Sequence, residues 1–141
     1  MPDLLHEIFV NAPAEKIYAA IATQKGLRLW WTADTTIEER VGGNAVFGFD
    51  KRATVFRMKV EELVPSKRVV LSCHGDVEEW KGTRLTWEIV PQDRGSSVQF
   101  RHAHWREATR LFAICNSSWG ELMHRLRDYS EGKNRGPLWT E

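Results

Sequence analysis

Apolar and polar residues alternate along most of the middle of the chain, which is typical of β-strands with one buried face. The clearest case is Thr54–Val64, where Phe56, Met58 and Val60 are separated by charged residues. Glycine-rich and proline-containing turns between such segments predict an antiparallel meander. The other strands are expected at Leu4–Val10, from Thr35 toward the Gly42-Gly43-Asn44 turn, and at Ala45–Phe49, Arg68–His74, Gly82–Val90 and Ser96–His104.

Helical spacing replaces this alternation near both ends of the chain. Pro13 suits the first position of a helix that runs to Thr23, because proline has no N–H to leave unpaired there. A second short helix is expected over Gln24–Trp31, and a long one over Glu107–Glu131, where apolar residues recur every three or four positions. The order predicts an α+β fold, and residues 1–141 are interpreted as one domain.

Several segments resemble one known superfamily. The stretch from Phe9 to Tyr18, with Asn11-Ala12-Pro13, is similar to the opening of START-like helix-grip (SRPBCC) proteins, and Trp30-Trp31-Thr32 to the aromatic pair that follows their short helices. Trp119–Tyr129 followed by Gly132 resembles the ending of the branch named after the activator of heat-shock-protein-90 ATPase homologue (AHSA-like). Here Trp119-Gly120 replaces the usual Gly-Trp, and Arg101–Trp105 replaces a glycine-containing strand end.

The resemblance implies a curved antiparallel sheet of about six to seven strands wrapped around a long C-terminal helix, with a cavity between them. Members of the superfamily bind apolar or amphipathic small molecules, and a minority are cyclases or lyases. The periodicity of the strands and helices puts a set of bulky residues on the inner faces, where they are expected to line such a cavity. They are Trp30, Trp31, Phe56, Met58, Leu71, Trp87, Phe100, His102, Trp119 and Leu122.

His102 is the polar residue of this set, in phase with Val98 and Phe100. It could orient a ligand, act as a general base, or be a core histidine with satisfied hydrogen bonds. His104 shares its phase, but two histidines without a third ligand are a weak metal site, and no metal is expected. A catalytic role would need a second polar group, for which Tyr18 and Asp34 are candidates.

The seven tryptophans divide by position. Trp30, Trp31, Trp87 and Trp119 fall on expected inner faces. Trp80, Trp105 and Trp139 fall in a loop, at a strand end and in the tail, where a lid or a protein partner would use them. Arg57, Glu88, Gln99 and Arg101 are expected on the opposite, solvated face of the sheet.

Composition narrows the function classes. The chain has 141 residues, is 28% charged and carries a net charge of +1, so it has no basic field for nucleic acid. Its start lacks a signal-peptide pattern, and no apolar stretch is long enough to insert in a membrane. Cys73 and Cys115 are isolated, so a reduced, cytoplasmic protein is expected. No nucleotide, hydrolase or metalloprotease motif occurs, and no cofactor is expected.

The sequence therefore predicts a binding protein for a small apolar or amphipathic molecule, and whether it is an enzyme stays open. One alternative is a cyclase or aldol-type enzyme of the polyketide cyclase-like class that uses His102. The other is a chaperone regulator or protein-interaction module, which includes a homodimer.

Overall fold

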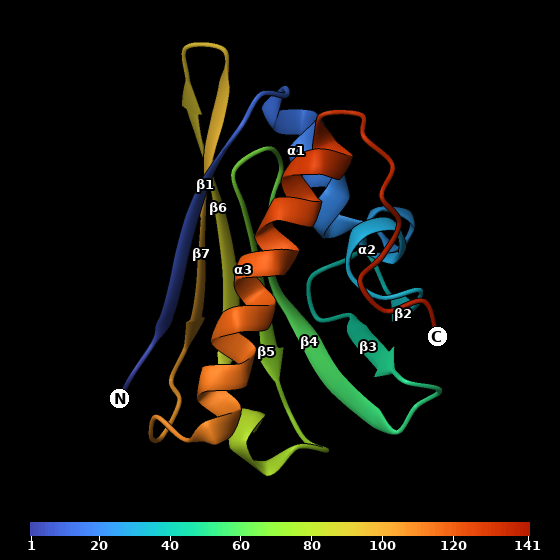
Figure 1. Ribbon diagram of the computed structural model, residues 1–141, viewed down its shortest axis with the longest axis vertical. Helices are drawn as coiled ribbons and strands as arrows, with labels where there is room; N and C mark the ends of the chain where they lie inside the picture. Colours follow the sequence, from blue (N-terminus) through green and yellow to red (C-terminus); the bar gives the residue numbers. More distant parts are fainter.

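The computed structural model describes residues 1–141 as an antiparallel sheet of seven strands, three α-helices and one 3₁₀ turn, η1 (Figure 1). The strands are β1 (Leu4–Val10), β2 (Asp34–Ile37), β3 (Asn44–Phe49), β4 (Thr54–Val64), β5 (Arg68–Cys73), β6 (Arg84–Gln92) and β7 (Gly95–Ala103). The helices are α1 (Ala14–Ala22), α2 (Gln24–Trp30) and α3 (Arg110–Ser130), and η1 is Glu78–Trp80. The predicted α+β helix-grip fold is confirmed.

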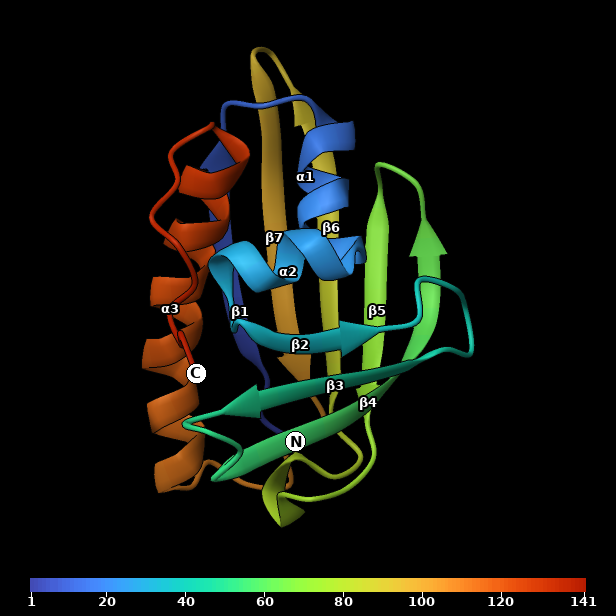
Figure 2. The ribbon, with the colours of Figure 1, turned by 90° about the vertical axis from the view of Figure 1, so that its right-hand side faces the viewer.

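The sheet has the order β1-β7-β6-β5-β4-β3-β2, so the first strand of the chain pairs with the last. Every other neighbouring pair is consecutive in sequence, as expected for a meander. The register shifts between Val60 and Glu62, where β4 bulges against β5. Figures 1 and 2 show α3 lying lengthwise along the inner face of the curved sheet, with α1 and α2 beside it.

Side-chain caps fix where two of the helices begin. The hydroxyl of Thr23 accepts a hydrogen bond from the Gly26 amide at 3.0 Å, and the hydroxyl of Thr109 accepts from the Phe112 amide at 3.3 Å. Gly26 also lets α2 pack closely on α1, because a Cβ there would lie 2.6 Å from the Ala19 carbonyl oxygen. The Thr23 cap and the close approach of Gly26 to α1 fix the position of α2, and with it the double tryptophan, Trp30 and Trp31, at its end.

The tail after α3 folds back over the sheet margin. The Trp139 amide donates to the Trp31 carbonyl at 3.2 Å, and the Ala33 amide donates to the Trp139 carbonyl at 2.9 Å. The Trp139 ring meets Phe49 edge-on, with ring centroids 4.8 Å apart. No helix combines the length and the apolar character that crossing a membrane requires.

Two expectations about side-chain direction are wrong. Trp80 and Trp105, expected at the surface, are only 4% and 1% exposed and belong to the core. His104, expected inside with His102, is exposed, because β7 ends at Ala103 and His104 has a φ of +72° that turns the chain. The two histidines therefore do not form a pair.

Candidate functional site

Trp119 lies at the centre of an aromatic layer between the sheet and α3. Its ring centroid is 4.3 Å from that of Phe100, 5.1 Å from Trp31 and 6.0 Å from Trp87. Trp31 in turn stacks on Phe47 at 4.2 Å. These rings come from the residue that follows α2 and from β3, β6, β7 and α3, so the layer connects the short helices with the sheet and the long helix.

A second group of rings continues the layer toward the start of α3. Trp80 of η1 stacks on Phe56 with centroids 3.8 Å apart and meets His102 edge-on at 4.5 Å. Trp105 lies 4.8 Å from His102 and 6.3 Å from Trp80. The imidazole is thus enclosed by the two indoles that were expected outside.

All ten residues predicted to line a cavity are buried, each with at most 9% of its surface exposed. Sequence reasoning missed Phe47, Phe49, Trp80 and Trp105, which pack in the same layer. The alternation in β3 could have found the two phenylalanines. No periodic pattern predicts that the two tryptophans are buried, because neither lies in a strand or helix long enough to show one.

His102 forms a complete hydrogen-bond chain. Its Nδ1 accepts from the Trp119 indole N–H at 3.2 Å, so the ring proton is on Nε2. Nε2 donates to the Thr83 hydroxyl at 2.9 Å, and that hydroxyl donates to the Trp80 carbonyl at 2.6 Å. Burial lowers the pKa of His102 to about 3, so the imidazole is neutral at physiological pH.

This arrangement limits the chemistry that His102 can perform. An imidazole with so low a pKa is a weak general base, and both of its nitrogens are already hydrogen-bonded. Asp34 is held by Arg52 in a two-point pair at 2.8 and 2.9 Å, which lowers the pKa of its carboxyl group. Asp34 is therefore committed elsewhere and does not assist His102.

The other reactive side chains of the core are inert. Burial raises the pKa of the Cys73 thiol to about 12 and that of Cys115 to about 11, so neither forms a thiolate at neutral pH. No group of three or more histidine, cysteine, aspartate or glutamate side chains is placed to hold a metal ion.

Three indole N–H groups in the layer have no oxygen or nitrogen acceptor, although that of Trp80 lies beside the thiol of Cys115, which is only a weak acceptor. They belong to Trp80, Trp87 and Trp105, whereas Trp30 donates to the Ala20 carbonyl at 2.8 Å and Trp119 donates to His102. A buried donor without an acceptor costs about 1–3 kcal/mol of folding free energy. The layer is therefore rich in unpaired donors although it is otherwise apolar.

Five hollows of the surface are lined almost entirely by other residues, and of the ten predicted residues only Phe100 borders one. One of the five reaches the aromatic layer from the side. It has a volume of about 290 Å³ and lies between η1 and the start of α3, where Trp105 forms part of its wall. The hydroxyl of Thr109 donates to Glu79 and the Arg106 guanidinium donates to the Glu78 carbonyl, and these hydrogen bonds connect its two walls.

Comparison with known proteins gives a family and a close structural relative. The family model described as "Activator of Hsp90 ATPase homolog 1-like protein" matches residues 11–131. The Aha1 dimer from Colwellia psychrerythraea is 33% identical, with a TM-score of 0.87, over 96% of this chain and all of that chain.

More distant structures share the fold. Protein MLL2253 from Mesorhizobium loti has a TM-score of 0.80 and 14% identity, over 90% of this chain and 95% of that one. CalU16 from Micromonospora echinospora has a TM-score of 0.75 and 14% identity, over 93% of this chain and 75% of that one. No curated protein sequence matches the chain significantly.

Proposed function

Since the chain belongs to the Activator of Hsp90 ATPase homolog 1-like family, whose fold is generally a ligand-binding one, we propose that it binds a small apolar or amphipathic molecule between the sheet and α3. No catalysis is included in the proposal. The observation that carries it is the set of unpaired indole N–H groups of Trp80, Trp87 and Trp105 in a layer of aromatic rings.

The proposal specifies the ligand's chemistry. Aromatic faces suit an apolar body, and unpaired N–H donors suit a carbonyl, ether or hydroxyl oxygen. Trp80 and Trp105 flank His102, so the oxygen would lie at that end of the layer. A ligand hydroxyl that displaced Trp119 could also donate to Nδ1 of His102, and the residue would then orient the ligand, which is one of the three roles that its sequence position allows.

Binding requires side chains to move, because nine of the ten predicted lining residues belong to one packed core cluster and His102 is enclosed by Trp80 and Trp105. The hollow beside Trp105 suggests where this movement would begin. Outward rotation of η1 would carry Trp80 away from Phe56 and His102 and extend that hollow into the layer. This rotation would break the hydrogen bonds from Thr83 to the Trp80 carbonyl, from Arg106 to the Glu78 carbonyl and from Thr109 to Glu79, so the ligand's contacts must compensate for them.

Two matched probes test this function: 2-acetylnaphthalene, which has an acceptor carbonyl, and 2-ethylnaphthalene, which has none. Tryptophan fluorescence should report saturable binding of both, with the ketone about tenfold tighter, the value of one hydrogen bond. Trp80→Phe or Trp105→Phe should remove that preference, and Trp139→Phe should keep it. Equal affinities for both probes, or no saturable binding, would overturn the proposal.

Protein binding is a second candidate function, favoured by the whole-length similarity to an Aha1 dimer. On this hypothesis the chain forms a homodimer or regulates the ATPase of an Hsp90-type chaperone. Trp80 and Trp105 are too buried to form the contact surface that the sequence suggested. Sedimentation velocity between about 5 and 500 μM tests the homodimer, and a purely monomeric profile would exclude it.

The cyclase alternative has less support. His102 has the low pKa of a buried, neutral imidazole, and no acid assists it. An oxygen-bearing aromatic substrate that was turned over by the wild type and not by His102→Gln would restore this alternative.

A further inference from the structure

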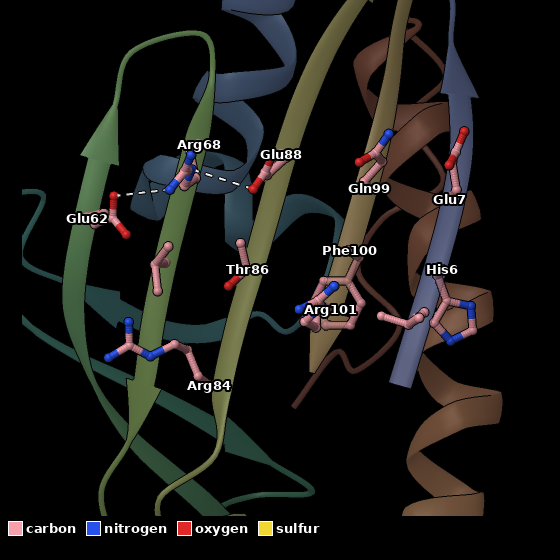
Figure 3. Close-up of a pocket in the computed structure, with 12 residues that line it drawn as sticks. His6, Glu7, Glu62, Arg68, Arg84, Thr86, Glu88, Gln99, Phe100 and Arg101 are labelled. Carbon is pink, nitrogen blue, oxygen red and sulfur yellow. Dashed lines mark hydrogen bonds and ion pairs between the residues drawn. The ribbon is translucent and has the colours of Figure 1, made fainter. Parts of the chain in front are cut away.

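The outer face of the sheet, opposite the aromatic layer, contains a row of charged side chains. Arg68 of β5 lies between Glu62 and Glu88, at 3.5 and 3.7 Å, as Figure 3 shows. Arg57 pairs with Asp76, and Arg101 lies 3.9 Å from Asp3. Most arginines on this face therefore have an acidic partner.

Arg84 is the exception. Its side chain makes no hydrogen bond or ion pair, and in Figure 3 it extends from β6 across β5, away from Glu62 and Glu88. Arg94 and Arg110 also lack an acceptor, but both are exposed, whereas Arg84 is half-buried. The guanidinium thus borders open hollows with none of its donors bonded to the protein, so they are free to bind an anion.

The backbone register explains why Arg84 is left uncovered. Its cross-strand neighbours are Ser72 on β5 and Ala103 on β7, which are both small. Two hollows therefore meet at Arg84: one of about 580 Å³ along the outer face of the sheet, and one of about 520 Å³ at the end of β5 and the start of β6.

The second hollow gathers further donors around Arg84. Lys81, His74 and His104 line it, and Glu61 is its single carboxylate. The Ser72 hydroxyl donates to Glu61 at 3.0 Å and, since it has one proton, it accepts from Nε2 of His74 at 2.7 Å. Glu61 accepts this bond and makes no ion pair with Arg84 or Lys81, so the charge of the two basic groups is not neutralised by it at short range.

From this juxtaposition we propose that the outer hollow at Arg84 and Lys81 is a binding site for a small molecule that bears a phosphate group. The guanidinium offers a planar set of donors and the ammonium a point charge from a second direction. A tetrahedral oxyanion accepts from several directions at once, which a planar carboxylate does less well. The volume falls in the range of small-molecule sites, so room remains for the organic part.

This site is independent of the proposed ligand between the sheet and α3. Residues on the same strands point to opposite faces, so Leu85 and Trp87 are buried in the core while Arg84 faces the hollow. Binding at Arg84 requires no displacement of the aromatic rings. Failure of one proposal would leave the other unaffected.

Amide NMR shifts during titration with inorganic phosphate test the site, with chloride adjusted to hold the ionic strength constant. The wild type should show saturable shifts at Ser72–His74 and Lys81–Thr86. Arg84→Gln should raise the Kd about tenfold, since a charge-assisted hydrogen bond is lost. Arg94→Gln, which removes an exposed arginine without a partner, should leave the Kd unchanged.

Further ligands and a second variant make the test decisive. Glycerol 3-phosphate should bind at least as tightly as inorganic phosphate, and glycerol should not bind, if the site takes a phosphate monoester. Lys81→Gln should also weaken phosphate binding, and this variant tests the site if Arg84→Gln does not fold. Shifts that do not saturate, equal effects of Arg84→Gln and Arg94→Gln, or acetate binding as tight as phosphate would each overturn the proposal.

Discussion

Strand β6 carries two different surfaces on one backbone. Leu85 and Trp87 are fully buried on the side of α3, whereas Arg84 and Thr86 are partly exposed on the opposite side. The inner side is filled by aromatic rings whose contacts leave only some N–H groups unpaired. The outer side has open hollows lined by charged groups. A ligand inside must therefore displace protein atoms, whereas a ligand outside must only displace solvent.

The comparison predicts very different costs of mutation on the two sides. Trp119→Ala removes the ring at the centre of the inner layer and should lower the free energy of unfolding by about 4 kcal/mol. Arg84→Gln on the outer side removes no hydrogen bond or ion pair and should change it by less than about 0.5 kcal/mol. Urea unfolding followed by circular dichroism measures both. Similar losses for the two variants would contradict the contrast between the surfaces.

The second prediction concerns pH and the buried imidazole. In the unfolded chain His102 takes up a proton near pH 6.5, but in the folded protein it stays neutral down to about pH 3. The contribution of His102 to the free energy of unfolding is therefore fully present above pH 6.5. It is lost as the pH falls from about 6.5 toward 3. Between pH 7 and pH 5 this residue should lower the free energy of unfolding by about 2 kcal/mol.

His102→Gln isolates that contribution. The variant keeps a polar side chain and retains His6, whose pKa is also lowered by burial, so the difference between the two proteins reports His102 alone. The stability of the variant should fall about 2 kcal/mol less than that of the wild type over the same interval. Parallel curves would mean that His102 titrates normally in the folded protein.

The same alternation that placed His102 inside explains how far sequence reasoning reaches. Side chains of β7 alternate by strand geometry, so Phe100 and His102 were predicted correctly to be buried. The alternation fails at His104, because one residue with a positive φ ends the strand, and no local pattern marks that position. Strand phase is thus predictable within a strand but not across its end.

The tryptophans show a second limit. Trp80 follows Glu78 and Glu79, so its neighbours in sequence indicate a surface loop. It is buried because η1 folds over Phe56, which is a contact between distant segments. The presence of a cavity is equally hard to predict from the sequence. Alternation gives the face on which each ring lies but not how much space remains between the rings. The sequence also could not single out Arg84. Its small neighbours, Ser72 and Ala103, lie beside it only because of the strand register, which the sequence does not give.

The third prediction concerns the contribution of the C-terminal tail to stability, at the point where it packs on the inner layer. Trp139 is half-buried and contacts Phe49 edge-on, so Trp139→Ala should lower the free energy of unfolding by about 1.5 kcal/mol. Glu141→Gln, which removes only an exposed pair with Lys51 at 3.4 Å, should cost much less. Thermal unfolding compares the two. Equal, small losses would show that the tail adds nothing to the layer.

The smallest expected effect lies on the outer face, where Arg68 bridges Glu62 and Glu88. Each of these side chains is more than 40% exposed, so water weakens the attraction, and Arg68→Gln should cost only about 0.5 kcal/mol at low salt. The loss should vanish in about 1 M sodium chloride, which screens exposed charges and leaves buried contacts unchanged. Urea unfolding at both salt concentrations, with Trp119→Ala as the reference for a salt-independent loss, measures this. A loss for Arg68→Gln that persisted in high salt would mean that the arginine stem packs on the sheet, and the outer face would then resemble the inner one more than its open hollows indicate.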